Sequence, residues 1–385
     1  MSSLSMAKVL SQFGEEYISQ YPCRAEQRRV VTCIRQCRTS ALGYIQIHCN
    51  CCEKETIQYH SCRNRHCPQC QRQASEEWRD KRQKDLLPVP YFHLVFTLPH
   101  EFNGWVRLHP REVYRLLFHA VWQTLQKFAS NPKRLNGELG ATMVLHTWGQ
   151  KLDQHVHLHV LVPAGAWNKQ AKQWHPSDST YLFPVKALSA GFKGRMVSAL
   201  RQAYEQGDMP NITRDGEVNR VLEESMNKDW VVYTKACHGK SERVLDYLSR
   251  YTHRIAISES RLIDTVDDGV RFRWKDYRDG KHKVMRLSGV EFLRGFLQHV
   301  LPHGFMRIRH YGFLSNRYRR VKLAEINDVL CRVKAHENKA TLEEVYSFTE
   351  RPLDPPPLWF CCHCNSPDIR VVRQVGGYRE RLRIM

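Results

Sequence analysis

The stretch HVHLHVLVPAG, residues 155–165, places histidines on alternate positions of an apolar run that ends at a proline. Residues two apart on a β-strand face the same way and lie about 6.5 Å apart along it. His157 and His159 can therefore bind one ion, whereas His155 lies a further step away on the same face. We predict a metal site at His157 and His159, with His155 available to bind substrate or to hydrogen-bond a metal ligand.

The opposite face of this strand is apolar and is predicted to pack on helices. Its residues are Val156, Leu158, Val160 and Val162. Burial of that face makes the strand rigid, which a metal site requires. The alternative is that the histidines are ordinary exposed residues of a half-buried strand. His146, in the preceding strand-like segment, is expected to be a packed or capped histidine rather than a ligand.

The charge of the chain indicates a polyanionic partner. Its 385 residues include 59 Lys and Arg against 39 Asp and Glu, a formal net charge of +20 that is spread along the chain rather than confined to a tail. Nucleic acid is the commonest partner of such a protein. The sequence contains no apolar run long enough to span a bilayer and no secretory signal pattern, so we expect no membrane partner and a cytoplasmic location, in the cytosol or nucleoid.

Composition divides the chain into three expected regions, at residues 1–88, 89–260 and 261–385. The second region alternates strand-like and helix-like segments, and its hydrophobic periodicity predicts these elements. They are strands at 91–99, 141–149 and 155–163 and a helix at 110–129. A hairpin is expected at 261–276, around Asp267, Asp268 and Gly269. The expected fold class is therefore α+β.

The cysteines of the first region predict a structural zinc site. Cys49, Cys52, Cys67 and Cys70 form two Cys-x-x-Cys pairs with fourteen residues between them. Four thiolates close the zinc shell and leave no open position for a substrate. Other nearby ligands, which allow a second zinc or a different choice of four, are Cys37, Cys51, His60, Cys62 and His66.

A further pair, Cys361 and Cys364, could complete a site with Cys362, His363 or Cys331. The basic flank of the first zinc segment, which begins with Arg63 and Arg65, is a candidate for contacting DNA.

Two tyrosines are candidate nucleophiles. In SERVLDYLSRYTHRIAIS, residues 241–258, Tyr247 and Tyr251 are four residues apart, so both project from one face of the predicted helix. The alternative is packing in a core or an interface.

The segment 306–322 interleaves arginines with aromatic residues. This pattern is typical of a surface that binds single-stranded nucleic acid. The candidates for DNA contact are Arg307, Arg309, Tyr311 and Arg317. The alternative is an ordinary basic surface with a few core aromatic residues.

The His-x-His strand, preceded by HLVFTLP, resembles the HUH endonucleases. Taken with the tyrosines, the chain resembles more closely the rolling-circle transposases of the insertion sequence ninety-one family, which carry an N-terminal zinc-binding domain. The resemblance rests on SCRNRHCPQC (61–70), YFHLVFTLP (91–99), LHTWGQKL (145–152), HVHLHVLVPAG, YLSRYTHRIAIS (247–258) and GFMRIRHYGFLSNRYR (304–319). The family commonly has proline where this chain has Val156.

The resemblance implies a ferredoxin-like antiparallel sheet with flanking helices that holds a catalytic divalent ion, Mg²⁺ or Mn²⁺, beside structural Zn²⁺. It implies that a tyrosine, Tyr247 or Tyr251, nicks single-stranded or hairpin DNA at a transposon end and leaves a 5′-phosphotyrosine link, with a target site as the second DNA partner. His155 and His253 are the candidates for a third ligand. The alternatives are a plasmid replication initiator or relaxase, and a non-catalytic zinc-dependent DNA-binding regulator; the oligomeric state is left open.

Overall fold

The computed structural model describes residues 4–178, 180–212, 215–237, 252–337 and 360–376. Its centre is a five-stranded sheet in the order β12-β4-β5-β3-β8, in which all neighbouring strands are antiparallel. The strands are β3 (Tyr91–Thr97), β4 (Gly140–Trp148), β5 (Gln154–Pro163), β8 (Val232–Cys237) and β12 (Ile308–Gly312). The predicted strands at 91–99, 141–149 and 155–163 are confirmed as β3, β4 and β5.

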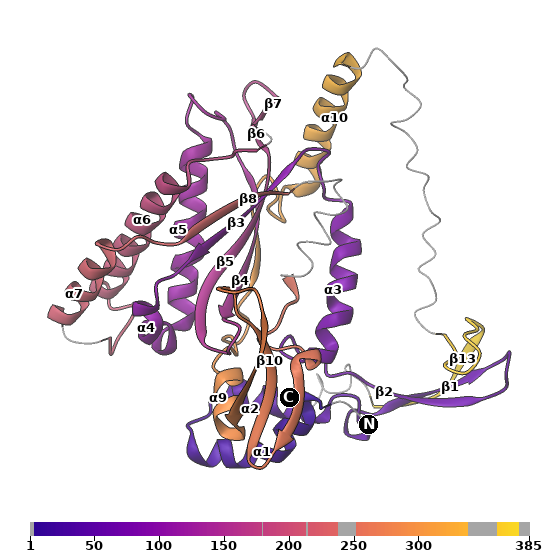
Figure 1. Ribbon diagram of the computed structural model, residues 1–385. Coiled ribbons are helices and arrows are strands. Elements are labelled where there is room, and N and C mark those ends of the chain that lie inside the picture. Colours follow the sequence, from indigo (N-terminus) through magenta and orange to yellow (C-terminus); the bar gives the residue numbers. More distant parts are fainter. Residues whose placement is uncertain (1–3, 179, 213–214, 238–251, 338–359, 377–385) are drawn as a thin grey trace.

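Helices cover one face of this sheet (Figure 1). They are α4 (Asn103–Leu108), α5 (Pro110–Ala129), α6 (Val185–Glu205) and α7 (Asp215–Met226), with the short helix η2 (His100–Phe102) before α4. The predicted helix at 110–129 is confirmed as α5, which starts with a proline at its first position, where no backbone N–H is needed. Val156, Leu158, Val160 and Val162 join the main core on this face, as predicted.

The opposite face of the sheet carries the histidines and is partly covered by α3 (Pro68–Gln83). Trp78 of α3, with Leu86 just after it, packs against Val144 of β4 and Leu161 of β5. Helix α10 (Arg319–Glu337) and the two-stranded sheet of β6 (Gly165–Asn168) and β7 (Gln173–Pro176) lie beyond one end of the sheet (Figure 1). Within the described ranges, no helix combines the length and apolar character that crossing a bilayer requires.

A second core joins the start of the chain to residues 256–300. Its helices are α1 (Met6–Gln20), α2 (Ala25–Gln36) and α9 (Gly289–Leu297), and its strands are β9 (Leu262–Val266), β10 (Gly269–Lys275) and β11 (His282–Ser288), with η3 (Glu259–Arg261) before β9. The predicted hairpin at 261–276 is confirmed as β9 and β10. Cys37, Cys67 and Cys70 belong to the same core, so the first and third expected regions share their packing.

Another three-stranded sheet has the order β13-β1-β2 and extends away from the central sheet (Figure 1). It consists of β1 (Tyr44–Cys49), preceded by η1 (Ser40–Leu42), with β2 (Glu55–Tyr59) and β13 (Ile369–Val375). Both β2 and β13 pair with β1 in antiparallel register, so segments from opposite ends of the chain form one sheet.

His299, just after α9, should make the stability of this fold depend on pH. Its Nδ1 lies 3.2 Å from the Thr147 hydroxyl and its Nε2 lies 3.2 Å from the Leu152 carbonyl oxygen. Burial lowers the pKa of His299 from 6.5 to about 4. Between these values the unfolded chain binds the extra proton and the folded chain does not, so the free energy of unfolding falls as the pH falls.

We expect the urea midpoint to drop less between about pH 7 and about pH 5 in His299→Gln than in the native protein, because glutamine does not titrate. The exposed His282 provides a control, since His282→Gln should keep the native pH dependence. An unchanged pH dependence in His299→Gln would contradict the prediction.

Candidate functional site

Three histidines converge on the face of the central sheet that is not covered by α5 and α6. His146 on β4 lies directly opposite His157 on β5 in the strand register, and His159 is the next residue on that face of β5. One ring nitrogen from each lies within 4.8 Å of the others. The ring centroids of His146 and His159 are 4.4 Å apart, and those of His157 and His159 are 4.9 Å apart. This group of three imidazoles can hold one metal ion.

Two neighbouring histidines, His146 and His155, stand in different relations to this group. His146, expected to be merely packed or capped, belongs to the group, because antiparallel pairing brings β4 alongside β5. His155 lies outside the group and is exposed. Its backbone carbonyl oxygen is 2.9 Å from Nδ1 of His157 and accepts the proton of that nitrogen in the neutral ring. This bond leaves Nε2 of His157 as the nitrogen with a free lone pair for a metal.

His93 on β3 was not among the residues predicted from the sequence. Its side chain contacts the ring of His159 and so helps to orient this ligand. Its Nε2 lies 2.8 Å from Nδ1 of His159, and the two rings are stacked with centroids 5.1 Å apart. Histidines that bind metals usually make such a bond through the second ring nitrogen, which fixes the ring orientation. The signal in the sequence is a polar residue inside the apolar strand YFHLVFTLP.

His157 and His159 are neutral imidazoles at neutral pH, so each has one ring nitrogen without a proton, as a metal ligand requires. Burial, with the nearby His155 adding to it, lowers the pKa of His157 to about 3. Burial also holds the pKa of His159 well below its usual value, with smaller effects from His146 and His157. Among the described residues the group includes no carboxylate. Three imidazoles suit a transition ion such as Mn²⁺ better than Mg²⁺.

We expect His93→Ala to weaken Mn²⁺ binding by about 10- to 100-fold, the usual effect of removing a residue that orients a ligand. Titration with Mn²⁺, with free ion measured by electron paramagnetic resonance, provides the measurement. His310→Ala is the control, since His310 is also a histidine of this sheet but bonds to Thr142 instead. Unchanged Mn²⁺ affinity in His93→Ala would exclude the orienting role.

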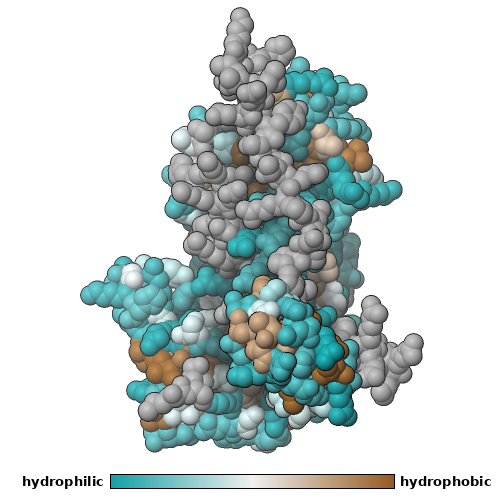
Figure 2. Space-filling view, turned by 90° about the vertical axis from the view of Figure 1, so that its right-hand side faces the viewer, coloured by the Kyte–Doolittle hydropathy of each residue, from teal (hydrophilic) through white to brown (hydrophobic). Residues whose placement is uncertain are grey.

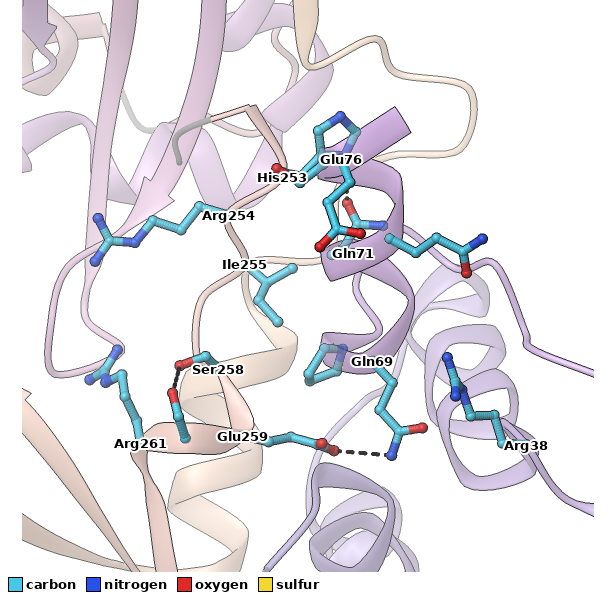
Figure 3. A pocket seen from close by; sticks show the side chains of 14 residues that line it. Arg38, Gln69, Gln71, Glu76, His253, Arg254, Ile255, Ser258, Glu259 and Arg261 are labelled. Atoms are coloured by element: carbon cyan, nitrogen blue, oxygen red, sulfur yellow. Dashed lines mark hydrogen bonds between the residues drawn. The ribbon is translucent and has the colours of Figure 1, made fainter. Parts of the chain in front are cut away.

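A pocket of about 820 Å³ lies between α3 and residues 253–261 (Figure 3). Arg254 and Arg261 line one side and Arg38 lies across from them (Figure 3). The charge of Arg254 is among the lesser causes, after burial, that lower the pKa values of His157 and His159, so its field reaches both rings. One wall of the pocket therefore carries a positive charge that acts on the candidate metal ligands.

Arg307 and Arg65, two of the expected DNA contacts, are instead engaged within the protein. Arg307 is 7% exposed and donates to Oε1 of Gln71 at 2.8 Å and to the carbonyl oxygen of Arg254 at 3.2 Å. Burial lowers its pKa to about 10, which leaves it charged at neutral pH. Arg65 donates to the carbonyl oxygens of Phe305 and Pro302. Arg307 thus links two residues that line the pocket, whereas Arg65 fastens the zinc segment to residues 302–305.

The other expected DNA contacts are more accessible, with one exception. Arg63 and Arg317 are exposed, and Arg309 lies half-buried over the ring of Phe118 at 4.3 Å. Tyr311 stacks on Trp122 with centroids 5.2 Å apart and packs against the main core, so its role is structural. Figure 2 shows that the described part of the face on the side of α3 and α10 is largely hydrophilic. That surface suits a charged partner.

The cysteines form two groups: the pairing of Cys49 and Cys52 with Cys67 and Cys70 is wrong, and the alternative of a different choice of four agrees with the structure. Cys67 and Cys70 lie with Cys37 and Cys62, and their sulfur atoms are 3.6 to 3.7 Å apart in the contacting pairs. A tetrahedral zinc ion with Zn–S bonds of 2.3 Å requires about 3.8 Å between sulfurs, so this group fits zinc. Cys49 and Cys52 lie with Cys361 and Cys364. His66 is in neither group, and its Nε2 accepts the amide of Leu301 at 3.5 Å.

The pairing of the cysteines follows from secondary structure. Cys37 ends α2, while Cys67 and Cys70 begin α3, and these ends meet in the second core. Cys49 is the last residue of β1, whose partner strand β13 follows Cys364. The predicted nucleophiles Tyr247 and Tyr251 lie outside the described residues.

Comparison with known proteins gives a consistent result. Residues 140–322 match a family model described as a putative transposase, and residues 9–98 match one described as a transposase zinc-binding domain, of the type found in insertion sequence ninety-one (IS91). The chain is similar to the putative transposase y4qJ of Sinorhizobium fredii, with 43% identity over 337 residues that cover 86% of this chain and 85% of the relative.

It is also similar to the transposase for insertion sequence element IS801 of Pseudomonas savastanoi pv. phaseolicola, with 28% identity over 296 residues that cover 74% of this chain and 70% of the relative. The histidine group falls within the first model and the Cys37 group within the second. Cys361 and Cys364 lie outside both.

Proposed function

Because this chain belongs to the family of transposases with an IS91-type zinc-binding domain, we propose that it nicks and rejoins single-stranded DNA at insertion-sequence ends through a 5′-phosphotyrosine intermediate. The observation that supports this chemistry most directly is the group of His146, His157 and His159, on which the charge of the pocket residue Arg254 acts. The reaction type would be that of an HUH endonuclease and strand transferase, which drives rolling-circle transposition.

The histidine group is the proposed site of the catalytic ion. We assign His157 and His159 as two ligands, as the sequence predicted, and His146 as the third in place of His155 or His253. When bound there, Mg²⁺ or Mn²⁺ would polarise the scissile phosphate and neutralise developing charge. His93 would hold the ring of His159 in place, and the carbonyl group of His155 would do the same for His157.

The proposed nucleophile is the phenol of Tyr247 or Tyr251. Its oxygen would bond to phosphorus while the bond from phosphorus to the 3′ oxygen breaks, and the phenolic proton would end on that oxygen as a free 3′-hydroxyl. Chain continuity supports this assignment, since Arg254, near the histidine group, is only three residues after Tyr251. A second tyrosine would allow a second junction to be attacked while the first DNA end stays attached.

The test is an adduct assay with a single-stranded oligonucleotide that carries the transposon end, in the presence of Mn²⁺. We expect the native protein to form a covalent product on a denaturing gel, and the Tyr247→Phe, Tyr251→Phe double variant to form none. Phenylalanine keeps the ring and removes only the hydroxyl. Tyr181→Phe, at an exposed position, is the matched control and should react normally.

The results of this assay distinguish the proposed transposase activity from the alternative functions. An adduct that persists in the double variant would exclude these nucleophiles. Sequence-specific DNA binding with no adduct on any end sequence would support the non-catalytic regulator. Adducts with a plasmid origin but not with insertion-sequence ends would support an initiator or relaxase.

Arg254 is the residue that we expect to contact the scissile phosphate. Its carbonyl group accepts from Arg307, it lines the pocket (Figure 3), and its charge acts on His157 and His159. Removing one such preorganised donor typically costs about 10²- to 10³-fold in rate. We expect Arg254→Ala to slow adduct formation by about 10²-fold with unchanged Mn²⁺ affinity, and Arg254→Lys to recover part of the rate. The control is Arg278→Ala, at an exposed position in the turn between β10 and β11; equal rates in both variants would refute the role.

A further inference from the structure

The second cysteine group joins segments that are more than three hundred residues apart. The sulfur of Cys49 is 3.5 Å from that of Cys364, and the sulfur of Cys52 is 3.5 Å from that of Cys361. All four sulfur atoms lie within 4.8 Å of one another. These spacings approach the value of about 3.8 Å that a tetrahedral zinc ion requires between thiolates. Cys49 is 1% and Cys361 is 7% exposed, so half of the group is buried.

The two Cys-x-x-Cys turns have the same backbone structure. In the first, the amide of Cys49 donates to the carbonyl oxygen of Lys54 at 3.0 Å and the amide of Glu53 donates to that of Cys49 at 2.9 Å. Glu53 has a φ of 57°. This turn directs both sulfur atoms of the pair to the same side.

The second turn repeats this pattern at the same offsets. The amide of Cys361 donates to the carbonyl oxygen of Ser366 at 2.9 Å, the amide of Asn365 donates to that of Cys361 at 2.9 Å, and Asn365 also has a φ of 57°. The amide of His363 lies 3.4 Å from the sulfur of Cys361. Two matching turns that face each other form a built four-thiolate site rather than a chance cluster.

Beyond the cysteines, hydrogen bonds and close packing join the two segments along β1 and β13. Asn50 donates from its backbone amide to the carbonyl oxygen of Asp368 at 3.0 Å and from its side chain to that carboxylate at 2.8 Å. β13 then pairs with β1 as far as Val375 opposite Tyr44. Beside this pair, Gly43 has a φ of 80°, and a Cβ there would lie 2.0 Å from the carbonyl oxygen of Val375. Only glycine allows this approach.

The sheet that carries the site has almost no core of its own. Of its strand residues only Ile45 and Cys49 are buried, both on β1, while β2 and β13 are largely exposed. Such a small sheet cannot be stabilised by apolar burial alone and normally requires a metal or another cross-link. Zinc bound by four thiolates supplies that stabilisation, because the metal-binding free energy becomes folding free energy.

We propose that Cys49, Cys52, Cys361 and Cys364 bind a second structural zinc ion, separate from that of the Cys37 group, which fastens residues 361–375 to the hairpin of β1 and β2. The matched zinc-binding domain model ends at residue 98, so this site lies half outside it. The C-terminal segment is thus part of the zinc-binding module. The proposal does not depend on the nicking chemistry.

Native mass spectrometry of the full chain tests the proposal by counting zinc. We expect the Cys361→Ser, Cys364→Ser double variant to hold one zinc ion fewer than the native chain, because zinc at the other two metal-binding groups is the same in both proteins. The control is the Cys51→Ser, Cys362→Ser double variant, which changes the exposed cysteines of the same two turns and should keep the native number of ions. An equal zinc count in the native chain and the Cys361→Ser, Cys364→Ser variant would overturn the proposal.

Limited trypsin digestion provides an independent measurement if the variant loses more than the local structure. Arg370 and Arg373 lie on β13, where pairing with β1 should protect the chain. We expect cleavage at these arginines at least tenfold faster in the Cys361→Ser, Cys364→Ser variant than in the control variant, with digestion of α5 unchanged. Equal cleavage in the two variants would show that no metal fastens this strand.

Discussion

Replacing His157 by alanine is expected to reduce covalent adduct formation by about 10³-fold, the largest catalytic effect of any single substitution outside the tyrosines. His157 supplies one of three imidazoles, and the metal they would hold contributes several kcal/mol of charge stabilisation at the phosphate. Two remaining ligands do not complete the site. The measurement is the rate of adduct formation at fixed Mn²⁺, together with Mn²⁺ affinity.

His157→Ala should lower both the rate of adduct formation and the Mn²⁺ affinity, because His157 would act through the metal ion. His282→Ala, at an exposed histidine on β11, is the matched control. Comparison of His146→Ala with His155→Ala then identifies the third ligand. We expect the first to lose Mn²⁺ binding and the second to keep it, since His155 touches the group only through His157, by a backbone hydrogen bond and a ring contact at 4.9 Å, and is not among the converging ligands. Native adduct formation in His157→Ala would refute the proposed metal site.

Cys37→Ala is expected to prevent stable folding of the helices α1, α2 and α9. Cys37 lies in the core that these helices share, and its sulfur is 3.6 Å from that of Cys70. The substitution would remove the zinc ion as well as a buried side chain. Structural zinc contributes an apparent binding free energy of about 10–16 kcal/mol, which equals or exceeds the stability of a typical domain of about 5–15 kcal/mol.

We expect the variant to lose one zinc ion and its cooperative thermal transition, measured by circular dichroism. Cys33→Ser is the control, since Cys33 lies one turn earlier on α2 and outside both cysteine groups. A zinc content and melting temperature that match those of the native protein would show that the Cys37 group is not a metal site.

Local patterns predicted the elements of the central sheet because they depend on residues that are close in the chain. Alternation of apolar residues predicted β3 and β5, and helical periodicity after Pro110 predicted α5. The same alternation placed His157 and His159 on one face, because the side-chain direction in a strand repeats every second residue. The net charge of +20 and the family motifs indicated DNA as the partner.

Contacts between distant segments were not visible in those patterns. Whether His146 or His155 joins His157 depends on the register between β4 and β5, and a shift of one residue would turn His146 to the other face. The same limit applied to Arg307, whose basic, aromatic-rich surroundings suggested a DNA contact although its donors are used by Gln71 and Arg254.

The sequence by itself determined which residue types can bind metal, where β3, β4, β5, α5 and the β9–β10 hairpin lie, and to which family the chain is similar. Only the tertiary structure decided which ligands meet. It divided Cys49, Cys52, Cys67 and Cys70 between two groups, because the strand after Cys364 pairs with β1 while the start of α3 packs against the end of α2. Ligand spacing is local, but a metal site closes only where the packing of distant elements brings its ligands together.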